Sequence, residues 1–346
     1  MSSSSDAFVQ YLVNNRSVVA ACLRDHVPNP VFNESVVDDL NRYLYVPVEQ
    51  FVMTGGKWVR PALCLLGAEA VGAPSRRAYS VAAAIELFQA AALMHDDIAD
   101  ESEMRRGQPC MYLSEGVGIA INAGDSALVA VTSCIMDDET YDAQTKLRLL
   151  DEIIRMERLT LEGQALDLGW ARDERWDISP EDYLAMARRK TAYYSAATPL
   201  VVGAICGGGS QEQIEGLRSF GLDCGLAFQI QDDLLNLVGD SDAQGKDYRS
   251  DITEGKRTLV MTWALAHLDV AQREELVRIL GAHAVDVGSL DRAVALAQES
   301  GAIEHARRYA RTLVERAKAA LDDVAVAEDA KVMLRSMADF FVDRTH

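Results

Sequence analysis

Two stretches of the chain place acidic residues at helical spacing directly after apolar runs. In HDDIADESEMRRG, Asp96 and Asp100 stand four residues apart, so their carboxylates share one face of a helix. Like charges at that spacing repel each other, and a bound cation would relieve the repulsion. The motif QDDLLN repeats the pattern with Asp232, Asp233 and Asn236. We therefore interpret the two stretches as halves of one site.

The residue types of these stretches suit Mg²⁺, a hard cation that binds a few carboxylates, keeps waters and shares substrate phosphate oxygens. Neither a calcium loop, a P-loop, a dinucleotide-binding glycine fingerprint nor a GxSxG elbow is found in the sequence. His95 adjoins the first acidic cluster, but its neighbours have the wrong spacing for a zinc pair, so we interpret it as structural. A lone DDxxD run is usually a solvated face. A metal site is indicated here because both acidic stretches follow apolar runs and basic residues lie near both.

Basic residues accompany the acidic ones. Arg105 and Arg106 follow the first motif directly, and GGKWVRP places Lys57 and Arg60 three apart after two glycines. Glycines let the backbone approach a ligand closely, and two cations on one turn can clamp an anion. The alternative interpretation of GGKWVRP alone is a helix break followed by a solvated basic turn.

Composition excludes several classes of protein. The 346 residues contain 34 Lys and Arg against 53 Asp and Glu, and a formal charge of −19 disfavours general nucleic-acid binding. Six scattered cysteines without a CxxC pair favour free thiols in a reducing compartment. The start of the chain lacks the pattern of a signal peptide, and we find no uninterrupted apolar run of about 18 residues. These observations predict a soluble cytoplasmic protein with no membrane span.

The elements that must position the acids are helices, since apolar residues recur at helical spacing, prolines are few and convincing strands are absent. We predict an all-α, single-domain fold over 1–346, with a peripheral N-terminal helix within 1–30, a motif-bearing core at about 50–260 and C-terminal helices at 261–346. The expected helices include 6–24, 35–53, 76–101 and 116–137, the last interrupted at Gly124-Asp125, and 203–210 is expected to be a flexible connection.

The segment before the first motif is apolar on nearly every side. From 81 to 94 its only charge is Glu86, and a helix of this kind is usually buried in a large bundle. Its end therefore delivers carboxylates to the mouth of a core, and Gln89, two turns before Asp96, lies on the same face. Further polar residues recur near the second motif: Gln164, Asp167, Lys190, Thr191, Gln229, Lys246 and Lys256. A deep apolar cavity with magnesium and cationic clamps at its mouth suits a hydrocarbon tail with a diphosphate head.

At this point the sequence resembles the trans-isoprenyl diphosphate synthases, the polyprenyl synthetase family, and most of all a geranylgeranyl diphosphate synthase. The resemblance covers 55–258 in order: GGKWVRP, HDDIADESEMRRG, GQALD, KTA, FQIQDDLLN, GK and DITEGKRT. It implies an antiparallel helical bundle around a deep central cavity, the isoprenoid synthase fold, usually as a homodimer. It also implies head-to-tail condensation of isopentenyl diphosphate with an allylic diphosphate, a prenyltransferase reaction.

The resemblance assigns roles to residues. Asp96, Asp100 and Asp232 would ligate magnesium, with three ions bound together with the diphosphate, and Asp97 and Asp233 would support them. The allylic diphosphate would be held by Arg105, Lys190, Thr191, Gln229, Lys246 and Lys256, and isopentenyl diphosphate by Lys57, Arg60, Gln89 and Arg106. The expected catalytic residues are the five aspartates with Arg105 and Lys190. In the family mechanism the allylic C–O bond ionises, and the isopentenyl double bond attacks the cation before a proton is lost.

Two positions depart from the family pattern. The second motif ends in Asn236 where many members have Asp, and Trp58 replaces a basic residue after Lys57. Some geranylgeranyl diphosphate synthases carry this Asn, so we expect activity to survive. Since Lys57 and Arg60 remain, we also expect the isopentenyl site to survive.

Residues four and five before the first Asp often set the product length in this family. Here they are Ala92 and Ala91, both small, and Phe88 lies one turn further down as a partial floor. We expect a C20 product, and Ala91→Phe should shorten it. The alternatives are a farnesyl or a longer-chain (C25 and above) synthase, a class I terpene cyclase, a non-catalytic regulatory subunit, and a helical scaffold with solvated acidic faces.

Overall fold

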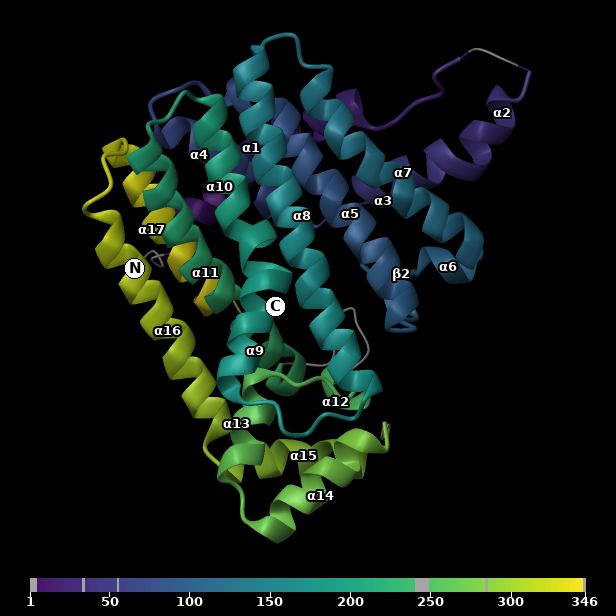
Figure 1. The fold of residues 1–346 in the computed structure, drawn as a ribbon, viewed down its shortest axis with the longest axis vertical. Helices are drawn as coiled ribbons and strands as arrows, with labels where there is room; N and C mark the ends of the chain where they lie inside the picture. The colour runs from purple at the N-terminus through teal and green to yellow at the C-terminus, as the bar shows by residue number, and fades with distance from the viewer. Residues whose placement is uncertain (1–4, 33–34, 55, 240–248, 284–285, 345–346) are drawn as a thin grey trace. The chain divides into compact units, whose positions relative to one another are not determined.

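The computed structural model describes residues 5–32, 35–54, 56–239, 249–283 and 286–344. The chain forms two compact units, each assembled from three segments: Met1–Ile154, Thr198–Arg218 and Val324–Leu334 in the first, and Arg155–Ala197, Ser219–Asp323 and Arg335–His346 in the second. Both are built from helices, which confirms the predicted all-α class (Figure 1). The prediction of one domain over the whole chain stays a prediction.

The first unit contains the N-terminal helices and the first acidic motif. Its elements are α1 (Asp6–His26), α2 (Val37–Leu40), the π-helix η1 (Asn41–Tyr45), α3 (Val46–Met53), α4 (Val59–Ala70), the 3₁₀-helix η2 (Ser75–Ala78), α5 (Tyr79–Ala99), strands β1 (Met104–Arg105) and β2 (Gln108–Pro109), α6 (Met111–Ser114), α7 (Val117–Met136), the start of α8 (Ala143–Arg172) and α10 (Thr198–Cys206). The helix predicted at 6–24 is confirmed as α1, and the one predicted at 35–53 consists of α2, η1 and α3.

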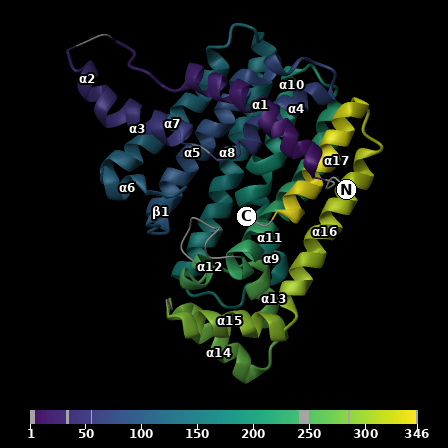
Figure 2. The ribbon, with the colours of Figure 1, turned by 180° about the vertical axis from the view of Figure 1, so that it is seen from behind.

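The second unit contains the second acidic motif. Its elements are the rest of α8, α9 (Pro180–Ala187), the π-helix η3 (Arg188–Ala197), most of α11 (Gln211–Val238), α12 (Ser250–Thr253), α13 (Leu259–His267), α14 (Val270–Gly281), α15 (Val287–Glu299), α16 (Ala302–Leu321) and the end of α17 (Glu328–Asp343). Within this unit α13 packs against both α9 and α16 (Figure 2).

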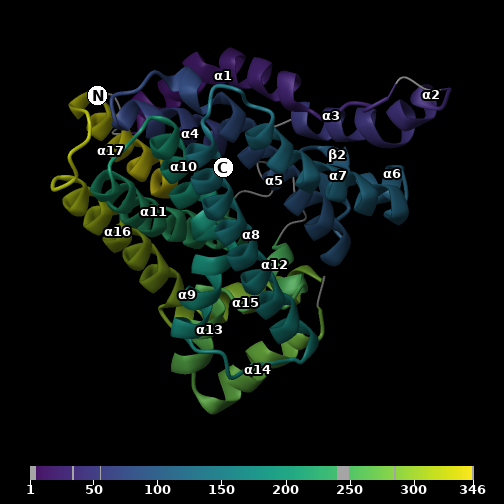
Figure 3. The ribbon, with the colours of Figure 1, turned by 45° about the horizontal axis from the view of Figure 1, so that its top comes forward.

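Helix α5 is the centre of the first unit. Every residue from 80 to 91 is buried, as its apolar character predicts. Helix α7 lies along it (Figure 3). A Cβ at Gly124 would come 2.4 Å from Nε2 of His95, so a larger residue there would displace the His95 side chain. The predicted interruption of the helix at Gly124-Asp125 is wrong, because α7 runs without a break from Val117 to Met136 and Gly124 lies against His95 of α5.

Helix α10 corrects a second prediction. The segment expected as a flexible connection from residue 203 is helical as far as Cys206. A Cβ at Gly203 would lie 2.0 Å from the carbonyl oxygen of Cys64 on α4, and a Cβ at Gly67 would lie 2.3 Å from that of Leu200. Two glycines thus let α4 and α10 approach backbone to backbone.

Glycines also bring three helices of the second unit together. A Cβ at Gly163 on α8 would lie 2.3 Å from the backbone nitrogen of Lys190 on η3. On the other side of η3, a Cβ at Gly225 on α11 would lie 2.6 Å from the carbonyl oxygen of Ala192. Gln229 and Asp233 follow Gly225 at intervals of four, so the face of α11 that packs on η3 carries these polar side chains onward.

The strands β1 and β2 form a hairpin that the sequence analysis did not predict. Arg105 pairs with Gln108, which leaves Arg106 and Gly107 as a two-residue turn with φ of 54° and 76°. Positive φ at both turn residues defines the tight hairpin turn that matches strand twist.

Among the described residues, α7 is the one helix that is long and apolar enough, by length and composition, to cross a membrane. One such helix is weak evidence for a membrane span, because buried core helices of soluble proteins have the same length and composition, and α7 packs against α5. The expectation that no segment spans a membrane stays a prediction.

Candidate active site

The first acidic motif occupies the last turn of α5. The backbone N–H of Asp100 donates to the carbonyl of Asp96 at 2.8 Å, so Asp96 and Asp100 both stand where the helix ends. Both are half-buried, whereas Asp97 is 1% exposed. Two carboxylates are therefore accessible to a ligand, whereas the middle one is buried; their roles as metal ligands and as a supporting residue stay predictions.

Asp97 binds Arg105 of the hairpin. The Nε atom of Arg105 donates to Oδ1 of Asp97 at 2.8 Å, and Nη2 of Arg105 also donates to that oxygen. Although burial opposes the charge, the hydrogen bonds and the charge of Asp97 raise the pKa of Arg105. The buried carboxylate thus fixes an arginine at the end of α5 close to the candidate metal ligands.

Arg106 takes a different direction from its neighbour. Its Nη2 lies 3.9 Å from Oε1 of Glu86, Nη1 donates to the carbonyl of Phe51 at 3.4 Å, and the guanidinium lies 5.9 Å from the Phe51 ring. Glu86 is eleven residues before Asp97, about three turns along α5. The two adjacent arginines are therefore held by two different acids of the same helix.

The remaining isopentenyl candidates surround the start of α4. Lys57 is exposed and precedes the helix, and Arg60 lies in its first turn. Trp58 between them is buried, with a left-handed φ of 47°. Arg16 of α1 lies over the Trp58 ring at 4.9 Å and donates to the carbonyl of Gly56 at 3.3 Å. A cation from α1 therefore lies against Trp58, the residue that departs from the family pattern.

Gln89 is buried on α5, one turn from Glu86. Its Oε1 has no hydrogen-bond partner among the described residues. An unsatisfied buried amide costs about 1–3 kcal/mol, so a polar ligand at this position would be stabilised.

In the second unit, Asp232 is partly exposed and bound to Arg344. Its side chain is 44% exposed, and Nη2 of Arg344 donates to Oδ1 of Asp232 at 2.5 Å. Arg344 lies near the C-terminus of the chain, and sequence spacing gave no signal of this pairing.

Asp233 is the buried member of the second motif. Tyr183 of α9 donates to its Oδ2 at 2.5 Å, and Nε2 of Gln229 donates to its Oδ1 at 2.7 Å. Thr191 in turn donates to Oε1 of Gln229 at 2.7 Å. Burial raises the pKa of Asp233 well above its usual range. This chain of hydrogen bonds joins α9, η3 and α11 and orients Gln229 and Thr191 together.

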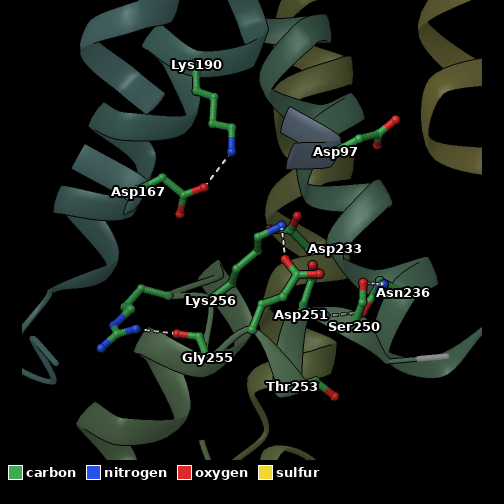
Figure 4. Close-up of polar contacts among 12 residues, drawn as sticks. Asp97, Asp167, Lys190, Asp233, Asn236, Ser250, Asp251, Thr253, Gly255 and Lys256 are labelled. Atoms are coloured by element: carbon green, nitrogen blue, oxygen red, sulfur yellow. Dashed lines mark hydrogen bonds and ion pairs between the residues drawn. The ribbon is translucent and has the colours of Figure 1, made fainter. Parts of the chain in front are cut away.

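Lys190 is held by Asp167. Its Nζ lies 2.5 Å from Oδ2 of Asp167, which is four residues after Gly163 on α8 (Figure 4). Gln164, the other polar residue predicted from this segment, is half-buried on the same helix. Lys190 and Thr191 belong to the π-helix η3, a distortion that is frequent at functional sites.

Asn236 has a structural partner. Its Nδ2 donates to Oγ of Ser250 at 3.1 Å, and its Oδ1 accepts from the backbone N–H of Asp251 at 3.1 Å (Figure 4). The amide thus ties α11 to the start of α12. Lys256, which follows α12, pairs with Glu254. Lys246 lies outside the described residues.

The candidate chain-length residues differ in exposure. Phe88 is 4% exposed and Ala91 is fully buried, whereas Ala92 is half-buried and stands four residues before Asp96. Ala92 therefore shares a face with Asp96 and Asp100, and Ala91 faces protein.

No group of three or more His, Cys, Asp and Glu side chains among the described residues is close enough to hold a metal by itself. The donors nevertheless fit a hard divalent cation, because Asp96 and Asp100 offer carboxylate oxygens on one accessible face of α5. A cation at such a place would take its remaining ligands from water and from substrate oxygens.

Within the first unit the structure brings together Arg105 with Asp97, and Arg106 with Glu86. Within the second it brings together Lys190 with Asp167, and Asp233 with Gln229. The sequence analysis missed Tyr183 and Arg344 as partners of the second motif, and it noted Glu86 without a role. A single charge in a long apolar run was the one signal that could have singled out Glu86.

Comparison with known proteins gives a consistent result. The Polyprenyl synthetase family profile matches residues 41–297. The short chain isoprenyl diphosphate synthase of Methanothermobacter thermautotrophicus is 38% identical over 315 residues, 90% of this chain and 94% of the relative. The geranylfarnesyl diphosphate synthase of Aeropyrum pernix is 35% identical over 302 residues, 85% of this chain and 92% of the relative. The geranylgeranyl pyrophosphate synthase of Corynebacterium glutamicum, solved with isoprenyl diphosphate and magnesium, superimposes with a TM-score of 0.82 at 29% identity, covering 99% and 97% of the two chains.

The fold and the paired acidic motifs thus define an all-α prenyltransferase of the isoprenyl diphosphate synthase class. The chain belongs to the polyprenyl synthetase family, whose enzymes use a divalent metal to elongate prenyl chains.

Proposed function

We propose that the chain condenses isopentenyl diphosphate head to tail with an allylic diphosphate in a magnesium-dependent reaction. The main product is all-trans geranylgeranyl diphosphate, and diphosphate is released. The observation that carries this proposal is the divergence of Arg105 and Arg106, which are adjacent in sequence but held by Asp97 and Glu86. Two separately oriented guanidinium groups suit two anionic substrates better than one.

Each substrate has its own set of residues in this proposal. Arg105, Lys190, Thr191, Gln229, Lys246 and Lys256 bind the allylic diphosphate, and Lys57, Arg60, Gln89 and Arg106 bind isopentenyl diphosphate. Their cations stabilise negative charge on the departing diphosphate. The apolar residues of α5 beyond Ala92 exclude water, which would otherwise quench an allylic cation.

Asp96, Asp100 and Asp232 are the proposed metal ligands, with three Mg²⁺ ions bound together with the diphosphate. Bound magnesium would supply Lewis-acid stabilisation of the leaving diphosphate. Asp97 and Asp233 act indirectly, because the first holds Arg105 and the second holds Gln229. Asn236 binds Ser250 and Asp251, which supports a structural role for the residue that departs from the family motif.

A C20 product is supported by the small residues Ala91 and Ala92 before the first motif. A farnesyl or a C25 synthase would differ mainly in the depth available to the chain. A class I terpene cyclase would not need the isopentenyl candidates Lys57, Arg60 and Arg106, and a regulatory subunit would not need both acidic motifs.

We also propose that the chain forms a homodimer and that it is located in the cytoplasm. Helix α7 presents an apolar outer face, with Val129 70% exposed and Val117, Ile121 and Met136 exposed beside it. Leu147 and Ile154 at the start of α8 are exposed and seven residues apart, so they share one helix face. A second copy would remove this apolar surface from water. All six cysteines are free thiols, which supports a reducing compartment.

The deciding experiment is turnover with isopentenyl diphosphate and each of the C5, C10 and C15 allylic diphosphates, followed by sizing of the products. We expect condensation that requires Mg²⁺ and ends mainly at C20. Consumption of an allylic diphosphate alone would indicate a cyclase, and absence of turnover with every starter would contradict the proposal.

A further inference from the structure

Glu86 is a buried acid that no role in the proposed reaction yet explains. Its side chain is 5% exposed, and Arg106 lies 3.9 Å away. The charge of Arg60, in the first turn of α4, also acts on it. A carboxylate taken out of water is costly unless it is paired, so the two arginines stabilise the charged form of Glu86.

The arginines also need Glu86. Burial lowers the pKa of Arg106, Glu86 opposes that change, and the neighbouring charges of Arg105 and Arg60 lower it further. Without an anion between them, Arg60 and Arg106 would repel each other in a partly buried space. In the structure Glu86 is that anion.

The other groups around Glu86 are neutral or engaged elsewhere. From α4, Cys64 faces it, and burial raises the pKa of this thiol well above its usual range. Helix α3 contributes the Phe51 carbonyl and ring, which contact Arg106.

The only charged residue of α7 is Asp125, which lies 3.5 Å from His95, and α10 carries no charged residue. Helix α1 buries Phe8, Val19, Cys22 and Leu23, and the pKa of Cys22 is raised by burial to about 12.

We infer that Glu86 is a positioning residue for isopentenyl diphosphate, which holds Arg60 and Arg106 together as a carboxylate and takes up a proton when the diphosphate group replaces it as their anionic partner. The inference rests on the proposed function, because it assumes that these arginines bind that substrate. The proton comes from solvent and no other bond changes. The exchange lets one pair of arginines be neutralised in turn by two different anions.

The acid–base properties of Glu86 suit this exchange. Burial raises its pKa to about 7, and the charges of Arg60 and Arg106 limit the rise. A diphosphate beside the same arginines would raise that pKa further, since like charges disfavour each other. Above pH 7 the Glu86 carboxyl is therefore charged in the free enzyme and neutral in the complex with isopentenyl diphosphate. Near pH 6 both are neutral.

A direct test counts protons. Calorimetric titration of isopentenyl diphosphate, with Mg²⁺ and a non-ionising allylic thiolodiphosphate present, would be repeated in buffers of different ionisation enthalpy. The wild type should take up about one proton more than Glu86→Gln at pH 8, and the difference should vanish near pH 6. Relative to this variant, wild-type affinity should fall by up to about tenfold per pH unit above pH 7.

Kinetics separate positioning from a merely structural role. Glu86→Gln keeps the size and shape of the side chain and resembles the neutral form of Glu86, so its KM for isopentenyl diphosphate at pH 6.5 should stay within about threefold of wild type. Glu86→Ala loses that shape and should raise this KM by about tenfold or more, with kcat changed less. If the role of Glu86 were purely structural, both variants would change the KM, and the pH profile of each would remain that of the wild type.

Glu152→Gln is the matched control. Glu152 is a buried carboxylate of the same unit that accepts two hydrogen bonds, of 2.8 and 2.7 Å, from Arg218. Arg218, unlike Arg60 and Arg106, is not proposed to bind a substrate. Its removal should leave the proton count unchanged. Two results would overturn the inference in an enzyme that still turns over its substrates. One is equal proton uptake by wild type and Glu86→Gln at pH 8, and the other is wild-type proton uptake that does not decline towards pH 6. Absence of both binding and turnover would instead overturn the proposed function and this inference with it.

Discussion

Arg344 donates a hydrogen bond of 2.5 Å to Oδ1 of Asp232, the accessible carboxylate of the second acidic motif. It also donates to the carbonyl of Phe228 at 3.1 Å, its guanidinium lies 4.0 Å from the Phe228 ring, and its own carbonyl accepts from Gln231 at 3.1 Å. The C-terminal arginine is thus fixed to α11 by several contacts. A guanidinium thus binds the carboxylate that we propose as a metal ligand.

Arg344→Ala should therefore strengthen metal binding. A partly exposed ion pair is worth up to about 1 kcal/mol, so the magnesium concentration for half-maximal binding should fall by roughly fivefold. Titration calorimetry with Mg²⁺ and inorganic diphosphate measures this directly. Arg344→Lys, which keeps the charge, should change it less, and weaker binding in Arg344→Ala would show that Arg344 contacts the diphosphate instead.

Replacing Asp96 and Asp100 by Ala should abolish magnesium-dependent turnover. Metal-ion stabilisation of a leaving group is worth several kcal/mol, so the loss in kcat should exceed about 10³-fold. Because both side chains are half-buried at the end of α5, the melting temperature should change little. Asp125→Asn, which removes an exposed acid of α7, serves as the control. Unchanged turnover in the double variant would refute the site assignment.

Ala92→Phe should shorten the product. Ala92 shares a face of α5 with Asp96 and is half-buried, so a larger side chain there would reduce the depth below the diphosphate. Chromatography of the products should show a shift from C20 towards C15. Ala91→Phe is a poorer probe, because Ala91 is fully buried and overpacking costs about 1–3 kcal/mol. An unchanged product in a stable Ala92→Phe enzyme would exclude residue 92 as the determinant.

Glu86 should make the ligand-free protein less stable as the pH rises. Its pKa is about 7 in the fold against 4.5 for the unfolded chain, so the folded state binds this proton more tightly. The corresponding stability is present below pH 4.5 and is lost as the pH rises through 7. The span of 7 − 4.5 = 2.5 units corresponds to about 3 kcal/mol at most. The free energies of unfolding of wild type and Glu86→Gln, measured in urea across this pH range, should diverge by about that amount. Parallel curves of this free energy against pH would contradict the assignment.

Val129→Glu should weaken the proposed dimer. Val129 is 70% exposed in the outer face of α7, so the substitution costs the isolated chain little, whereas a buried unpaired charge at an interface costs several kcal/mol. Sedimentation velocity should show a shift from dimer to monomer. Ser126→Glu, on the same helix, tests whether any charge on α7 suffices. A wild-type chain that sediments as a monomer would refute the dimer.

The helices and the acidic motifs could be predicted from sequence, because their signals are local. The apolar run of α5 and the prolines after α1 mark elements without reference to the rest of the chain. Gly124 and Gly203 were misread, since a glycine that ends a helix and one that admits a neighbouring helix look alike in sequence. Only the contacts with His95 and Cys64 distinguish them.

The partners of the site residues could not be predicted for a related reason. Tyr183 and Asp233 are 50 residues apart, and Arg344 and Asp232 are 112 apart, so no periodicity links them. Arg106 lies 3.9 Å from Glu86 and has a positive φ, which residues other than glycine seldom adopt, and the sequence signals neither feature. Such pairings depend on how distant elements pack.

The hairpin turn has a consequence for the spacing of the two substrates. Eleven residues separate Glu86 from Asp97, which corresponds to about 16 Å along the helix axis. Arg105, at the end of β1, donates to Asp97, and Arg106, in the turn, lies 3.9 Å from Glu86, so two consecutive arginines contact acids at both ends of that interval. In the proposed reaction, the turn would therefore set the distance between the two diphosphate groups while the carbon–carbon bond forms.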